Sequence, residues 1–211
     1  MQSAPLVFTH PVEPQDQARA DMYALLSRLY SAAPDAALLS AIASADEIHI
    51  ERQQSEGSNL AGAWHELVAA SAITEPASAA EEYQDLFVGV GKSEVSLHGS
   101  TYVKALSGKQ LLVGIRETLS RLGLARRSSA SSYEDHLAAV CETMRLLITG
   151  ADEIQPFGLD EQCEFFSAGI EPWVFACCSA ISAKTVANYY RRVAQFTESF
   201  MAVERDSFAM E

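Results

Sequence analysis

The sequence is short of basic side chains and has no long uninterrupted apolar run. Its 211 residues include 15 lysines and arginines against 28 aspartates and glutamates, for a formal net charge of −13 at pH 7. This balance disfavours nucleic acid or an anionic membrane as the main partner and suits a basic peptide or protein surface, although excess acid alone also keeps a protein soluble. No segment approaches the ~20 apolar residues that a membrane-spanning helix needs, so we expect no membrane insertion.

The beginning of the chain lacks the features of a secretory signal. The stretch MQSAPLVFTHPVEPQDQ has neither a basic n-region nor a long apolar h-region, and a signal peptide requires both. We therefore expect the protein to stay in the cytoplasm, where it is made. Residues 1–16 are predicted to form an extended N-terminal segment.

Cysteine is sparse, and no two cysteines have the spacing of a metal ligand pair. There is no CxxC motif, and the two adjacent cysteines would point in different directions on a helix, so neither a zinc site nor a disulfide framework is indicated. Reduced, buried thiols are expected instead. The four cysteines are Cys141, Cys163, Cys177 and Cys178.

The chain also lacks the alternating pattern of β-strands and any internal repeat. Apolar residues recur instead at three- and four-residue intervals, which predicts amphipathic helices. The fold is therefore expected to be all-α: a single globular helical bundle over residues 1–211, with eight or more helices, no sheet, and a loop at 150–159 before the C-terminal helices. The helical segments are 18–30, 38–42, 60–68, 76–87, 107–119, 137–148, 173–181 and 186–200.

Local signals mark where several of these helices begin and end. Ser107-x-x-Gln110 has capping-box spacing and predicts the start of one helix, while Gly123 and Gly150 predict the ends of two others. The glycine-rich stretch 88–100 has no helical stripe and is predicted to be a loop.

That loop contains a sequence that superficially resembles a nucleotide-binding loop, Gly89-Val90-Gly91-Lys92-Ser93. A phosphate-binding loop needs its first glycine where this chain has Leu86, and it follows a strand, whereas the preceding segment here has a helical pattern. A glycine-rich turn between helices is the better interpretation.

The histidines do not form a recognisable metal or catalytic pattern. A di-metal site in a helical bundle uses Glu-x-x-His pairs, and only Asp46-x-x-His49 approaches this spacing, once. Cys141 and His136 are five residues apart on one helix, so their side chains diverge, and Cys141 lies on the apolar face. The five histidines are His10, His49, His65, His98 and His136.

One polar cluster precedes an apolar helical run, in the stretch SSYEDHLAAVCETM. Glu134 and Asp135 suit the free N–H groups and the positive dipole at a helix start. His136 gains nothing from that dipole. A paired Asp135 and His136 beside a glycine-rich loop is therefore interpreted as a group that fixes the loop or contacts a ligand.

Taken in order, several motifs together resemble a known protein family. A Tyr-x-x-Leu-Phe helix leads into a glycine turn, then a Gly-Ser-x-Tyr stretch, then an Asp-His pair that opens an apolar helix. This order is similar to that of the TorD/DmsD family of cytoplasmic chaperones for molybdenum-containing oxidoreductases, which is related to the NarJ-type chaperones. The motifs are Tyr83-Gln84-Asp85-Leu86-Phe87, Gly89-Val90-Gly91, Gly99-Ser100-Thr101-Tyr102 and Ser132-Tyr133-Glu134-Asp135-His136.

The resemblance implies an all-helical protein that is not an enzyme and has no cofactor of its own. Such a chaperone binds the twin-arginine signal peptide of a molybdoenzyme client, holds back export until the client's cofactor is inserted, and also contacts the client body. The apolar segment of a signal peptide needs an apolar surface to bind, and the peptide's arginines need carboxylates. The implied peptide-binding residues are Tyr83, Leu86, Phe87, Gly91, Gly99, Tyr102, Asp135 and His136.

The match has departures, and two points stay open. Val90 replaces the family's proline, Ser132-Tyr133 replaces Glu-Pro, and Gly169-Ile170 stands where His-Leu is frequent. The sequence leaves open whether the protein is a monomer or a helix-swapped dimer. The alternative function is a nucleotide- or metal-dependent hydrolase, and a third is a helical adaptor that binds only a mature protein surface.

Overall fold

A computed structural model describes the chain over residues 13–48, 59–89, 93–103, 105–124, 133–151 and 154–210. Within these ranges the protein is all-α, as predicted, with nine α-helices and no strand. The elements are α1 (Pro14–Ser31), α2 (Ala36–Ala43), α3 (Leu60–Ile73), α4 (Pro76–Tyr83), the π-helical turn η1 (Gln84–Val88), the 3₁₀ turn η2 (Gly99–Thr101), α5 (Ala105–Arg121), α6 (Leu137–Thr149), α7 (Leu159–Gly169), α8 (Glu171–Ser182) and α9 (Tyr189–Phe208).

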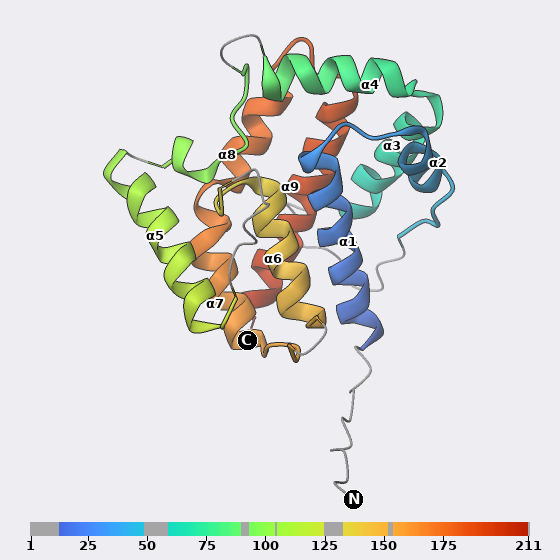
Figure 1. The fold of residues 1–211 in the computed structure, drawn as a ribbon. Coiled ribbons are helices and arrows are strands. Elements are labelled where there is room, and N and C mark those ends of the chain that lie inside the picture. The colour runs from blue at the N-terminus through green and yellow to red at the C-terminus, as the bar shows by residue number, and fades with distance from the viewer. Residues whose placement is uncertain are drawn as a thin grey trace, which may run out of the picture.

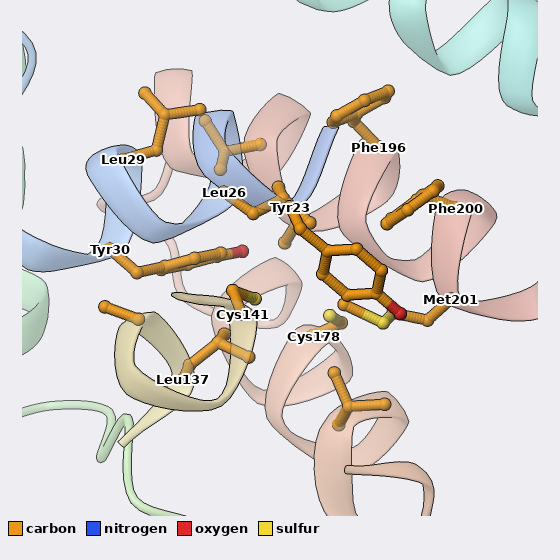
Figure 2. Close-up of a cluster of buried hydrophobic side chains, with 14 of the residues drawn as sticks. Tyr23, Leu26, Leu29, Tyr30, Leu137, Cys141, Cys178, Phe196, Phe200 and Met201 are labelled. Atoms are coloured by element: carbon orange, nitrogen blue, oxygen red, sulfur yellow. The ribbon is translucent and has the colours of Figure 1, made fainter. Parts of the chain in front are cut away.

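The core lies between α1, α6, α8 and α9. Helix α1 packs along α6, and α9 packs against both α3 and α8. Helices α1, α6, α8 and α9 form the centre of the bundle (Figure 1). Their apolar stripes meet because residues three and four apart share one face of a helix. Figure 2 shows these side chains turned toward one another: Tyr23, Leu26, Leu29, Tyr30, Leu137, Cys141, Cys178, Phe196, Phe200 and Met201.

Short-range capping explains where two of the helices start. The Asp35 carboxylate accepts a hydrogen bond from the Leu38 N–H (2.8 Å) and begins α2. The Asn59 side chain accepts from the Gly62 N–H (3.1 Å) and begins α3. Each side chain satisfies one of the N–H groups that a helix leaves free at its start.

Several boundaries differ from the sequence predictions, and α7 is a helix that the sequence did not predict. Helix α1 begins at Pro14, inside the predicted extended segment. Helix α5 begins at Ala105, so the capping box at Ser107 was a wrong start signal. Helix α9 begins at Tyr189, and Val186 lies before it, 48% exposed.

A buried ion pair fastens the N-terminal helix to the C-terminal one. Arg19 of α1 donates from Nε (2.8 Å) and from its terminal nitrogen (2.9 Å) to the two oxygens of Glu204 in α9. The Tyr23 hydroxyl also donates to Glu204 (3.0 Å). The Glu204 carboxylate, 2% exposed, thus accepts hydrogen bonds from both Arg19 and Tyr23 of α1.

Within the described ranges, no single helix is both long enough and apolar enough to cross a membrane. Helices α7 and α8 would reach that length and composition together, but they are bent by 53° at their junction.

Candidate functional site

The Tyr-x-x-Leu-Phe motif lies at a change of helix type. Tyr83 is the last residue of α4, and Leu86 and Phe87 lie in the π-helical turn η1. The turn closes when the Gly89 N–H donates to the Gln84 carbonyl (2.7 Å). Gly89 has φ +64°, which side chains on other residues disfavour. Single π-helical turns are frequent at functional sites, because the extra residue redirects side chains.

An aromatic cluster forms around this turn. The Phe87 ring contacts Tyr83 (centroids 5.3 Å apart), Tyr190 of α9 (5.0 Å) and Tyr30 of α1 (6.3 Å). Tyr83 and Phe87 are half-buried. This leaves part of each ring at the surface, so these two predicted residues do lie together.

The neighbours of Phe87 differ in exposure. Val88 is 51% exposed, whereas Leu86 is completely buried. Leu86 therefore belongs to the core and exposes no side-chain surface that a peptide could contact.

The segment after the glycine turn is anchored at successive residues. The Val95 N–H donates to the Leu86 carbonyl (2.9 Å), and the Leu97 carbonyl accepts from the Leu137 N–H (2.8 Å). His98 and His136 form an isolated antiparallel bridge. The segment 95–99, which we call the anchored loop, thus joins η1 to the start of α6.

Asp135 is the main polar anchor of this loop. Its carboxylate, 1% exposed, accepts from the Ser100 N–H (3.0 Å) and lies 3.3 Å from Nδ1 of His98. Its backbone carbonyl also accepts from the Gly99 N–H (2.9 Å). Burial opposes ionisation, but the hydrogen bonds from His98 and Ser100 outweigh it, so the pKa of Asp135 lies well below its ordinary value.

His136 has a different role from the one that its position suggested. It is the N-cap of α6, and its Nδ1 accepts a hydrogen bond from the Ala138 N–H (3.2 Å). An accepting Nδ1 requires the neutral ring. Burial, followed by the proximity of His98, lowers the pKa of His136 to about 4.

Glu134 and Asp135, which the sequence suggested as acids suited to a helix start, lie before the first turn of α6. The first turn of α6 holds no acidic residue, since the helix begins at Leu137. Glu134 instead pairs with Arg116 of α5 (3.0 Å). Both acids instead bind groups from other parts of the fold, Asp135 the Ser100 N–H of η2 and Glu134 the Arg116 guanidinium of α5.

Gly99 and Tyr102 pack against one aromatic side chain of α8. A Cβ on Gly99 would lie 2.6 Å from Nε1 and Cε2 of the Trp173 indole, so no larger residue fits without a shift. The Tyr102 ring stacks on Trp173 (centroids 6.3 Å apart, 14° between planes), and its hydroxyl donates to the Ser96 carbonyl (2.7 Å).

The structure therefore gathers the predicted site residues into two adjoining groups. Tyr83, Leu86 and Phe87 form one, and Gly99, Tyr102, Asp135 and His136 form the other, with the Val95–Leu86 hydrogen bond between them. The predicted Gly91 lies outside the described residues, as do Val90 and Lys92 of the glycine-rich loop.

His98 is the site residue that the sequence reasoning missed. Its ring lies between those of Tyr133 (6.1 Å) and His136 (4.9 Å), and it contacts Asp135. The sequence feature that could have identified His98 is its position directly before the Gly-Ser-x-Tyr motif and after the apolar residues Val95 and Leu97.

Chemically, the polar groups at this site hold backbone in place. Asp135 and His136 both accept from backbone N–H groups, and so fix a surface. Among the described residues, no group of three or more His, Cys, Asp or Glu side chains could hold a metal ion. Burial raises the pKa of the Cys177 thiol to about 12 and that of Cys141 still further, which disfavours a nucleophilic role.

Comparison with known families agrees with this description. The family described as nitrate reductase delta subunit matches residues 53–179, which is more than half of the chain and contains both groups of site residues. No curated protein matches the chain. The protein therefore belongs to the nitrate reductase delta-subunit family, which is a family of chaperones for the maturation of redox enzymes.

Proposed function

We propose that this protein is a cytoplasmic chaperone that binds the twin-arginine signal peptide of a molybdenum-containing oxidoreductase. It retains the client until the client's cofactor is inserted and then releases it for export. The proposal also includes contact with the body of the client. The chain acts by binding and not by catalysis.

The observation that carries this proposal is an aromatic surface next to a firmly anchored loop. Tyr83 and Phe87 expose part of their rings beside Val88, which is 51% exposed. A preformed apolar surface reduces the entropy that is lost when a peptide binds, because the protein side is already ordered. The apolar segment of a signal peptide is a suitable occupant.

Charge supports a basic partner as well. The net charge of −13 favours association with cationic peptides. Glu81 and Asp85 are exposed on the same stretch of helix as Tyr83 and Phe87. Carboxylates bind arginine through short, charge-assisted hydrogen bonds.

The experiment titrates a fluorescent twin-arginine leader peptide into the protein and measures the affinity by anisotropy. Val88→Asp places a charge on the proposed surface, and we expect binding to weaken about ten-fold or more. Val113→Asp is the matched control, because Val113 on α5 is 50% exposed and lies on another helix. The variants are compared only after circular dichroism shows native helix content.

A second variant tests the loop. We expect the Asp135→Ala, His136→Ala double variant to bind more weakly, because the anchored loop loses its polar contacts. Failure of the wild-type protein to bind the leader, or unchanged affinity in both Val88→Asp and a folded double variant, would overturn the proposal. A leader peptide with Lys-Lys in place of Arg-Arg reports the contribution of the arginines.

A further inference from the structure

Helix α9 begins without a side-chain cap of its own. Its N-cap residue, Asn188, makes no capping hydrogen bond, although a helix start leaves several N–H groups in need of partners. Glu82 of α4 supplies them: its carboxylate accepts from the N–H groups of Asn188 (2.8 Å), Tyr189 (3.0 Å) and Tyr190 (2.7 Å). A carboxylate at this position also suits the positive end of the helix dipole.

The end of α1 is held at the same place by two tyrosine hydroxyls. The Tyr83 hydroxyl donates to the Tyr30 carbonyl (3.3 Å), and the Tyr190 hydroxyl donates to the Leu29 carbonyl (3.0 Å). These carbonyls belong to the last turn of α1, which has no intrahelical donors left for them. Figure 1 shows α4 lying across this end of the bundle, above the end of α1.

The Glu82 cap of α9 therefore also positions Tyr190, which packs against the aromatic residues of η1 and α4. Tyr190 is the third residue whose N–H donates to Glu82, and its ring packs on Phe87 (5.0 Å) and Tyr83 (5.7 Å). Without the Glu82 carboxylate, the backbone of Tyr190 loses a hydrogen bond that helps to position its ring against Phe87. Packed aromatic pairs have directional preferences, so a small shift of one ring moves the other.

We propose that Glu82 is a positioning residue for peptide recognition. It joins α4 to the first turn of α9 and so fixes Tyr83, Phe87 and Tyr190 relative to one another, without contacting the peptide itself. This inference rests on the proposed function, whose apolar surface it explains.

The test compares Glu82→Ala with Glu75→Gln, a control on the same helix. Glu75 is exposed and makes no capping hydrogen bond, so its substitution removes a carboxylate charge from α4 and leaves α9 untouched. We expect Glu82→Ala to bind the leader peptide about ten-fold more weakly, a typical size for coupling between sites. Glu75→Gln should bind as the wild type does.

Restoring the cap from within α9 separates positioning from simple stabilisation. In the Glu82→Ala, Asn188→Asp double variant, the new carboxylate can cap α9 locally. We expect the melting temperature to recover while the peptide affinity stays low, because the link between α4 and α9 is still missing. Recovery of both would show that Glu82 acts only through helix stability and would overturn the inference.

A third measurement does not depend on the peptide. Hydrogen exchange by mass spectrometry should be faster in Glu82→Ala than in the wild type, both at residues 188–190 and at residues 86–88 in η1. Faster exchange at 188–190 alone would contradict the inference, because the aromatic surface would then be fixed without Glu82.

The outcomes distinguish the two proposals. A wild-type protein that does not bind the leader overturns the proposed function, and the exchange measurement then decides whether Glu82 orders η1. If the wild type binds the leader and a folded Glu82→Ala variant binds it equally well, the inference on Glu82 is overturned and the proposed function is not.

Discussion

Gly99 is the position in the anchored loop where a side chain has no room, and Gly114 in α5 is its opposite. A Cβ on Gly99 would meet the Trp173 indole at 2.6 Å, whereas a Cβ on Gly114 would meet nothing within 4 Å. The two glycines therefore serve different purposes, although they look alike in the sequence.

Gly99→Ala should lower the free energy of unfolding by about 2 kcal/mol, because overpacking forces Trp173 or the loop to move. Gly114→Ala should raise it by about 1 kcal/mol, since alanine is the better helix former. Urea denaturation of both variants checks the pair. Equal effects would mean that the contact with Trp173 does not constrain position 99.

His136 makes stability depend on pH. Its pKa is lowered from the ordinary 6.5 to about 4 in the folded protein, so between these values the unfolded chain binds the proton more strongly. The contribution of His136 is complete above pH 6.5 and is lost as the pH falls toward 4. At pH 4.5 the loss should reach about 2.5 kcal/mol.

The measurement is urea denaturation at pH 7.5 and pH 4.5. His136→Asn keeps an N-cap acceptor but does not titrate, so it should lose less stability than the wild type over this interval. The same pH dependence in both proteins would contradict the assignment of the neutral ring to the cap of α6.

At the scale of the elements, the structure shows which local patterns suffice to place a helix. The stripes of α1 and α6 were predicted because many apolar residues agree on one face. The capping box at Ser107 rested on two residues, and a helix that begins at Ala105 overrides it. The π-helical turn could not be predicted, because Leu86 and Phe87 fit an ordinary helix equally well.

The candidate site was predictable only as far as its motifs are local. The sequence singled out Asp135 beside the glycine-rich loop, but its partner His98 lies 37 residues away along the chain. Glu82 lies more than 100 residues from the helix that it caps. Side chains this far apart leave no periodic signal in one sequence, so such pairings appear only in the folded chain.

The α1–α9 ion pair gives a prediction at this scale. Burial alone would lower the pKa of Arg19, but hydrogen bonds to Glu204 raise it above the ordinary value. Glu204→Ala should cost about 3 kcal/mol, because Arg19 then keeps only its 3.0 Å ion pair with Asp16. Tyr23→Phe should cost about 1 kcal/mol, since it removes a single hydrogen bond.

A double variant, measured by chemical denaturation, provides the control. The Arg19→Met, Glu204→Leu variant removes both charges and should recover much of the stability that Glu204→Ala loses. A double variant that is less stable than Glu204→Ala would contradict this account of the ion pair.

At the scale of the whole molecule, the reactivity of the cysteine thiols measures how often the bundle opens. All four are free thiols; three are buried in the core, and Cys163 is partly exposed on α7. Burial raises the pKa of each buried thiol, to about 12 for Cys177.

A thiol-reactive dye should therefore modify Cys163 first in the native protein. The other three should react about 1,000-fold more slowly, because they become accessible only when the bundle opens. Cys163→Ser should abolish the fast phase. Rapid modification of a second thiol under native conditions would mean that the core opens locally.

The fastening of α1 to α9 also affects the order of events during synthesis. Glu204 is 181 residues from Tyr23, and Thr197 is 167 residues from Tyr30. On the ribosome, the first helix emerges long before its partner, and contacts of such high sequence separation form late. The apolar stripe of α1 therefore packs on α6 but lacks its α9 partner until α9 leaves the exit tunnel. A chain interrupted before α9 would present that stripe to the cell instead of the finished surface, so the bundle closes only once α9 has been translated.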